Sequence, residues 1–344
     1  MLSSLIRRRW PIPVIVLTVV VTLVISAVAA SSGGDDDTLV VYNGRAHYGS
    51  EEVFEEFTKA TGIEVELRGG TGPELFTRLQ EEGDDTPADI LITTDMANLW
   101  RAKDAGLLQP ATSPTLEENI PEGLHDPEGY WWAISTRLRI PVVNVDAIDP
   151  ADITSYEDLG DPQYEGRTCL RTSSNEYNQS LVADMIAKRG EEATRALLES
   201  WMANDPEIIP SDGEMLDVIA DGDCDLGLSN HYYLGRKLKD DPSFPVAPAW
   251  PDQDGAGAHT NVSGLGIVEG TDDYDLAQQF VEFMTSTAAE DHVVEGSEFA
   301  ANPDVPPPAW IADWADVKQD PIVADEAGPL LGEAQQLMLE VGWQ

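Results

Sequence analysis

Three tyrosines stand where their side chains could bind a metal ion: Tyr177 and the adjacent pair Tyr232 and Tyr233. Each follows a short strand-like run and an Asn residue that can cap a helix, so each phenol is predicted in the first turn of a helix. Backbone N–H groups that lack helical partners gather in that turn, and their partial positive charge favours a phenolate.

Tyr48 repeats this arrangement nearer the N-terminus. It lies between the strand-like run Leu39–Tyr42 and a helix predicted to begin at Glu51, and His47 directly precedes it. In an open α/β sheet, ligands bind where the carboxyl end of a strand meets a helix. We therefore expect Tyr48 and His47 on the rim of one lobe, the other three tyrosines on the rim of a second lobe, and a cleft between them.

Phenolate oxygens are hard donors, and a group of them suits Fe³⁺ better than zinc or copper(I). The side chains of Tyr232 and Tyr233 are about 100° apart on a helix, but at its start both can lean toward one ion beyond the helix end. The alternative for each tyrosine taken singly is a packed aromatic ring with a satisfied hydroxyl group.

The order of predicted elements is that of an α/β fold with largely parallel sheets, in two lobes joined by extended crossing strands. The chain has 344 residues and 42% hydrophobic content, enough for two domains. We expect one lobe from residues 38–138 and about 259–290, and the other from residues 139–258 and about 291–344. The predicted strands include Leu39–Tyr42, Ile63–Leu67, Asp89–Thr93, Arg139–Val145, Thr168–Leu170, Asp225–Ser229 and Val262–Val268, and the helices Glu51–Ala60, Pro73–Glu82, Met96–Asp104, Tyr177–Lys188, Glu191–Met202, Asp275–Met284 and Leu330–Val341.

Residues 1–30 are predicted to be a signal peptide for export. Three arginines, Arg7–Arg9, precede the apolar run Val14–Val24, and the small residues Ala27–Ala29 follow it. The alternative is an uncleaved membrane anchor. Residues 31–37, which end in three aspartates, are predicted to be an acidic tether. The chain is therefore expected outside the cytoplasm, in the periplasm or an equivalent compartment.

The chain is strongly acidic, with 63 Asp and Glu against 20 Lys and Arg and a net charge of −43. Such a surface repels nucleic acids and anionic membranes, so neither is an expected partner. The acidic residues are spread along the chain and form no spaced chelating motif. They therefore indicate a solvated surface suited to high salt, with a cation-gathering surface as the alternative.

The two cysteines, Cys169 and Cys224, lie at the end of one predicted strand and the start of another. Two neighbouring strands of one sheet would bring the thiols within bonding distance, and an exported protein meets an oxidising compartment. We therefore predict a disulfide; the alternative is a pair of buried free thiols.

Three strings resemble the ferric-iron-binding proteins of bacterial ABC transporters, and most of all the FutA branch of that family. They are Arg167–Leu181 (RTCLRTSSNEYNQSL), Asp221–Gly235 with its Cys and its Tyr pair, and His259–Gly264 (HTNVSG). The resemblance runs from about Leu39 to Trp343. It implies a bilobed periplasmic-binding-protein fold of type II, no enzymatic activity, an ABC permease as partner and a monomeric state.

The resemblance also implies the iron ligands. Carried over to this chain, they are Tyr48 with His47, Tyr177, and both Tyr232 and Tyr233. The family often has Arg-His-Tyr in the first turn, whereas this chain has an additional Ala46 between Arg45 and His47. We therefore rank His47 below the tyrosines.

Related ferric-binding proteins hold a synergistic anion near an arginine. The resemblance makes such an anion an expectation here, with Arg137, Arg139 and Arg236 as candidates.

Two other functions fit parts of the sequence. The same fold serves solute-binding proteins for thiamine, polyamines or phosphonates, whose sites would use the aromatic rings for stacking. A cell-surface sensor would share the iron site and differ in its partner. An exported hydrolase is poorly supported, because the sequence has no Gly-x-Ser-x-Gly, no His-Glu-x-x-His and no phosphate-binding glycine loop.

Overall fold

The first sheet is built from strands whose apolar residues face helices on both sides. The computed structural model describes residues 38–45 and 51–344. The predicted signal peptide and acidic tether, as well as His47 and Tyr48, lie outside the described residues. The sheet contains β2 (Glu64–Gly69), β1 (Thr38–Asn43), β3 (Ile90–Thr93), β10 (Ala258–Val268) and β5 (Trp132–Asn144), in that order.

Within this sheet, β1 runs parallel to both β2 and β3, whereas β10 is antiparallel to β3 and β5. Every residue of β3 is buried, as expected of a central strand covered on both faces. The covering helices include α1 (Glu51–Thr61), α2 (Gly72–Glu82), α3 (Met96–Asp104), α4 (Pro114–Asn119) and α9 (Tyr274–Met284), with the short strand β4 (Leu108–Gln109) at β10.

Local sequence sets the helix starts. At the predicted start of α2, the Thr71 hydroxyl accepts a hydrogen bond from the Glu74 backbone N–H, and the Glu74 carboxylate accepts one from the Thr71 backbone N–H. This reciprocal cap satisfies two donors that the helix itself cannot pair.

The second sheet has the order β5, β8 (Leu226–Asn230), β6 (Thr168–Arg171) and β7 (Glu207–Ile209), with β9 (Val246–Pro248) also paired to β5. Strands β6, β7 and β8 are mutually parallel, and β5 is antiparallel to β8. Its helices are α5 (Glu176–Arg189), α6 (Glu191–Ala203), α7 (Asp212–Asp221) and α8 (His231–Asp240). The prediction of largely parallel sheets thus holds for the strands of each lobe, and the crossing strands are the antiparallel ones.

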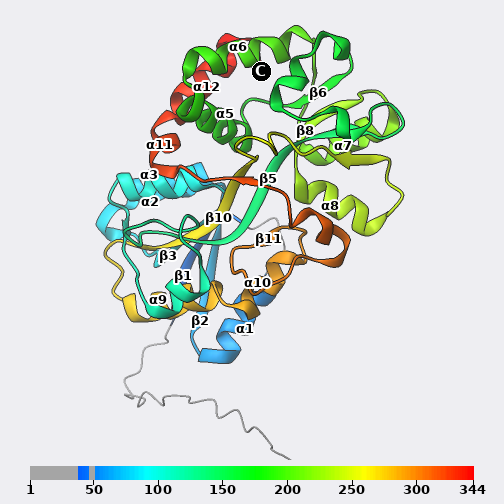
Figure 1. Ribbon diagram of the computed structural model, residues 1–344. Coiled ribbons are helices and arrows are strands. Elements are labelled where there is room, and N and C mark those ends of the chain that lie inside the picture. The colour runs from blue at the N-terminus through cyan, green and yellow to red at the C-terminus, as the bar shows by residue number, and fades with distance from the viewer. Residues whose placement is uncertain (1–37, 46–50) are drawn as a thin grey trace, which may run out of the picture. The chain divides into compact units, whose positions relative to one another are not determined.

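Strand β5 crosses from one sheet to the other. Its first half, Trp132–Leu138, pairs with β10, and its second half, Arg139–Val143, pairs with β8. Figure 1 shows β5 and β10 running from the lower sheet into the upper part of the molecule. The predicted crossing strand at Arg139–Val145 is confirmed. It begins seven residues earlier, at Trp132, because the preceding residues pair with β10 of the first sheet, and it ends at Asn144.

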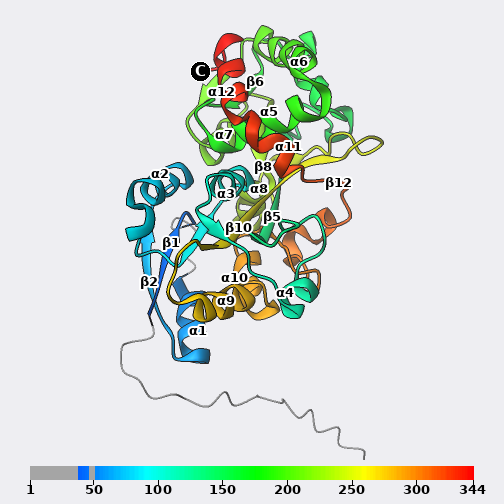
Figure 2. The ribbon, with the colours of Figure 1, turned by 90° about the vertical axis from the view of Figure 1, so that its left-hand side faces the viewer.

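The C-terminal part of the chain contacts both lobes. Helix α10 (Thr287–Val294) packs on α9, and β11 (Phe299–Ala300) pairs with the first half of β5. Farther on come η6 (Ala309–Trp314), β12 (Gln319–Asp320), α11 (Ala324–Ala327), η7 (Gly328–Leu330) and α12 (Leu331–Glu340). Helix α12 packs on α5, as Figure 2 shows, and η7 contacts both α3 and α5. The residue boundaries of the lobes stay a prediction.

Among the described residues, none of the helices combines the length and the apolar run that a membrane crossing requires.

A disulfide joins Cys169 to Cys224, whose Cα atoms are 5.9 Å apart. Cys169 lies in β6, which pairs with β8, and Cys224 lies two residues before the start of that strand. The predicted disulfide is confirmed, and the alternative of two free thiols is wrong. The bond ties the two strands whose carboxyl ends lead to Tyr177 and Tyr232.

We expect the double variant Cys169→Ser, Cys224→Ser to lower the free energy of unfolding. The two residues are 55 positions apart, and opening a loop of that size costs about 2–4 kcal/mol. Urea unfolding of the oxidised proteins measures the difference, and wild-type protein treated with a reductant is the control. Equal midpoints for the variant and the oxidised wild type would contradict the expectation.

Candidate functional site

Tyr177 lies in the first turn of α5, as predicted. Strand β6 ends at Arg171, a four-residue turn follows, and Asn175 caps the helix by accepting a hydrogen bond from the Tyr177 backbone N–H at 3.1 Å. The tyrosine side chain is 5% exposed. It therefore sits at the carboxyl end of a parallel strand, in the position that open α/β sheets use for ligands.

Tyr232 and Tyr233 lie in the first turn of α8, which follows β8 without any loop. Their ring centroids are 4.4 Å apart. Asn230 is the N-cap residue by position, but its side chain makes no capping bond. Instead, its Nδ2 donates to the Tyr232 hydroxyl at 3.4 Å, and its Oδ1 accepts from Arg139 at 3.1 Å. Asn230 was predicted to cap α8 through its side chain. It does not, because the buried Arg139 donates to the amide oxygen that a cap would use.

The fold brings these three tyrosines together. Strands β6 and β8 are parallel neighbours, so the helices that follow them start side by side. The Tyr177 phenol lies close enough to the phenols of Tyr232 and Tyr233 for both to influence its pKa. Tyr48 and His47 lie outside the described residues, so their place in the site stays a prediction.

Burial raises the pKa of the Tyr177 phenol above its ordinary value, and the nearby Glu176 carboxylate adds to this rise, whereas the Arg137 guanidinium lowers it. The expected bias toward a phenolate at the helix start is therefore weaker than the effect of burial. The phenol stays protonated at neutral pH until a bound cation displaces the proton.

Two arginines cover the tyrosine rings. The Arg137 guanidinium carbon lies 4.8 Å from the centre of the Tyr177 ring, and that of Arg236 lies 4.9 Å from the centre of the Tyr232 ring. Arg137 is 2% exposed, and its Nη2 is 3.7 Å from the Asp95 carboxylate. Two of the three arginines named from the sequence as candidates for an anion site are thus next to the tyrosines.

In the described part of the chain, one group of His, Cys, Asp or Glu side chains is close enough to share a metal ion: Cys169, Glu207 and Cys224. The disulfide occupies both sulfurs of this group, so it is no metal site.

The chain matches a family model described as bacterial extracellular solute-binding protein over residues 52–319. The chain belongs to this family. It is 37% identical to Iron uptake protein A1 of Synechocystis over 314 residues, which cover 88% of this chain and 87% of that protein.

Two solved structures extend the comparison. FutA (IdiA) of Trichodesmium, in complex with iron and citrate ligands, has a TM-score of 0.83 and 34% identity, covering 89% of this chain and all of that one. Apo FutA2 of Synechocystis has a TM-score of 0.81 and 36% identity, covering 90% of this chain and all of that one. The predicted resemblance to FutA-like ferric-binding proteins and the bilobed α/β fold are confirmed. Since these relatives are solute-binding proteins, the expectation that the chain is not an enzyme is confirmed as well.

Arg139, the third arginine predicted near the anion, is committed elsewhere in this solute-binding protein. Its guanidinium donates to Asn178 at 2.8 Å, to Asp212 at 3.2 Å and to the backbone carbonyl of Leu228 at 3.2 Å, besides its bond to Asn230. These bonds use four of its five N–H donors inside the second lobe, so Arg139 holds α5, α7 and β8 together.

Arg171 is a site residue that the sequence analysis did not single out. It pairs with Asp212 at 2.7 Å, and its guanidinium carbon lies 5.8 Å from the centre of the Tyr177 ring. Asp212 is fully buried and accepts from both Arg171 and Arg139. The signal available in the sequence was the position of Arg171, the last residue of the strand that leads to Tyr177.

We expect Asp212→Ala to lower the free energy of unfolding by about 3–5 kcal/mol, because it leaves two guanidinium groups without their buried partner. The control, Asp217→Ala in the same helix, removes an exposed ion pair with Lys237 and should cost less than about 1 kcal/mol. Chemical denaturation of both variants measures the two effects. Similar losses for both variants would contradict the structural role of Asp212.

Proposed function

We propose that this protein captures Fe³⁺ outside the cytoplasm and delivers it to an ABC permease. Tyr177, Tyr232 and Tyr233 bind the ion through their phenolate oxygens, and Tyr48 completes the set from the other lobe. His47 ranks below the tyrosines as a ligand. The observation that carries the proposal is the meeting of Tyr177 with Tyr232 at the ends of two parallel strands, in a chain similar to proteins named for iron uptake.

The charges around the tyrosines support a trivalent cation. Four phenolates around Fe³⁺ leave one excess negative charge, and the buried guanidinium of Arg137 lies over the Tyr177 ring to offset it. Arg171 and Arg236 add positive charge on two further sides of the tyrosines. A hard ion with high charge is the ligand that can displace protons from phenols as deeply buried as these.

A synergistic anion next to Arg137 or Arg236 is part of the proposal. Among the residues that the structure describes, none makes a hydrogen bond with Arg137 Nη2, although this nitrogen is buried and 3.7 Å from the Asp95 carboxylate. A small carboxylate or carbonate could accept a hydrogen bond from it while binding the ion. The structure of Trichodesmium FutA was obtained with citrate as well as iron.

Transport follows from the two-lobe architecture and from the family. The lobes meet through β5 and β10, so closure on the ion can bring tyrosines from both lobes to one point. The closed protein, as a monomer, would then present a face to the permease, whose ATPase supplies the work. The predicted signal peptide would place the protein in the periplasm or an equivalent compartment.

We expect the iron-loaded protein to be orange to red, because phenolates bound to Fe³⁺ give a charge-transfer band. Tyr232→Phe removes one phenolate, so it should weaken the band and lower affinity by more than about tenfold, since even changes outside the ligand shell cost that much. Ferric titration followed by visible absorbance measures both.

The matched control is Tyr274→Phe, which removes a phenol that donates to the Pro110 carbonyl in the first lobe. It should leave colour and affinity unchanged. Colour and affinity of wild-type strength in Tyr232→Phe would count against the proposed ligand set. A colourless titration together with tight thiamine binding would select the organic-cation alternative.

Acid should release the iron. Burial raises the pKa of Tyr177, so its phenol is protonated in the iron-free protein and has to lose a proton on binding. For each such phenol, affinity should fall about tenfold per unit of decreasing pH. Competition with a chelator of known pH dependence, from neutral to mildly acidic pH, measures the slope. The slope should be smaller by about one proton in Tyr232→Phe, and an equal slope would contradict the role of that phenol.

A further inference from the structure

The residue before Tyr177 bonds to the other lobe. Glu176 is the first residue of α5, and its carboxylate accepts hydrogen bonds from the Thr94 hydroxyl at 2.8 Å and from Asn98 Nδ2 at 3.2 Å. Thr94 directly follows β3, and Asn98 lies in α3, so both belong to the part of the chain built on the first sheet. Both are buried, with exposures of 3% and 4%.

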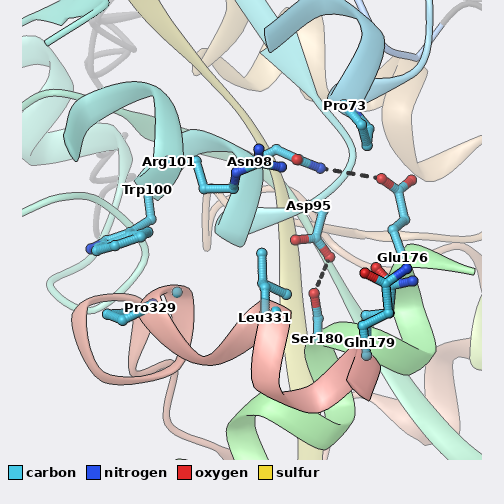
Figure 3. A pocket seen from close by; sticks show the side chains of 13 residues that line it. Pro73, Asp95, Asn98, Trp100, Arg101, Glu176, Gln179, Ser180, Pro329 and Leu331 are labelled. Carbon is cyan, nitrogen blue, oxygen red and sulfur yellow. Dashed lines mark hydrogen bonds between the residues drawn. The ribbon is translucent and has the colours of Figure 1, made fainter. Parts of the chain in front are cut away.

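A second bond between the lobes lies one helical turn farther along α5. The Ser180 hydroxyl donates to the Asp95 carboxylate at 2.6 Å. Asp95 is held in place by its own lobe, because it caps α3 and also accepts from Asn261 Nδ2 of the crossing strand β10 at 2.8 Å. Figure 3 shows the Glu176–Asn98 and Asp95–Ser180 bonds one above the other, between α3 and α5.

Glu176 and Ser180 are four residues apart, so they share one face of α5. That face meets α3, while Tyr177 lies about 100° around the helix, and its phenol is close enough to that of Tyr232 for the two to interact. The turn of helix that carries Tyr177 is therefore attached to the first lobe on both sides of the tyrosine. The three bonds between the lobes are made by protein side chains alone.

From these contacts we propose that Glu176, with Thr94 and Asn98, is a latch that holds the two lobes closed over the ion and positions Tyr177. The inference rests on the proposed function. By linkage, contacts that favour the closed state raise the affinity for an ion that binds only there, and they slow its release. Glu176 thus acts through Tyr177 as a positioning residue and does not bind the ion itself.

The latch can be removed without disrupting a core. Glu176, Asn98, Asp95 and Ser180 line a cavity of about 530 Å³ that also reaches η7 and α12. Water can occupy the space that a truncated side chain leaves, because the cavity is roomy and the polar side chains of Asp95, Ser180 and Gln179 line it. Alanine variants should therefore fold.

The test compares iron release from wild type, Glu176→Ala, Asn98→Ala and the double variant. The charge-transfer band of each ferric-loaded protein is followed after mixing with excess chelator. We expect each single variant to lose iron about tenfold faster than wild type, since each removes a hydrogen bond to a carboxylate. The double variant should be no faster than Glu176→Ala, because both changes remove the same contact.

The control is Glu192→Ala, which removes an exposed carboxylate from the first turn of the neighbouring helix α6. Like Glu176→Ala, this variant loses one negative charge in the first turn of a helix. Its iron release should nevertheless occur at the wild-type rate. Small-angle scattering of the iron-free proteins supplies a second readout, with a larger radius of gyration for Glu176→Ala and Asn98→Ala than for wild type and the control.

Wild-type release rates in both latch variants would overturn the inference. So would fast release in Glu176→Ala alone, because the effect would then be local to α5. If wild-type protein developed no charge-transfer band with ferric iron, the proposed function would fail, and the scattering comparison would still decide whether the latch exists.

Discussion

A buried phenol does not ionise without a cation next to it, and the organisation of this site follows from that constraint. The three tyrosines of the second lobe stand just after the carboxyl ends of two parallel strands, where Tyr177 and Tyr232 are buried and Tyr233 is partly buried. Burial raises the pKa of Tyr177, so its phenol stays neutral without a bound cation. In the proposed iron site, a trivalent ion would reverse this preference, whereas an ion of lower charge would offset less of the cost. The burial that makes the Tyr177 phenol a poor acid would then contribute selectivity.

The guanidinium groups around the tyrosines reduce the electrostatic cost of collecting phenolates. Arg137 and Arg171 approach the Tyr177 ring, and Arg236 approaches Tyr232. Two of these arginines are themselves paired with buried carboxylates, Arg137 with Asp95 and Arg171 with Asp212. Each of these two guanidinium groups thus has a buried carboxylate and a tyrosine ring as neighbours, so each buried charge lies next to one of opposite sign.

The two lobes depend on strands that belong to both. Because β5 pairs with β10 in one half and with β8 in the other, the lobes share one continuous set of backbone hydrogen bonds. A rotation between the lobes then has to be absorbed near the middle of β5, while side-chain contacts such as those of Glu176 can form and break. Within each sheet the parallel strands stay undisturbed, so the geometry of the three tyrosines persists when the lobes move.

The local structure around the tyrosines is encoded in the adjacent residues. A strand leads directly into a helix at Tyr177 and at the Tyr232–Tyr233 pair, and these signals act over a few residues, so the first-turn positions were predictable. The disulfide was predictable as well, because the two cysteines lie in or next to strands that follow the same order of elements.

The partners of the charged side chains, in contrast, are set by the packing of the whole chain. Arg139 and Arg171 look equivalent in the sequence, yet one is confined to the interior of a lobe and the other reaches Tyr177. Glu176 meets Asn98 across 78 residues of chain. Such pairs depend on the register and packing of distant elements, and no local pattern encodes them.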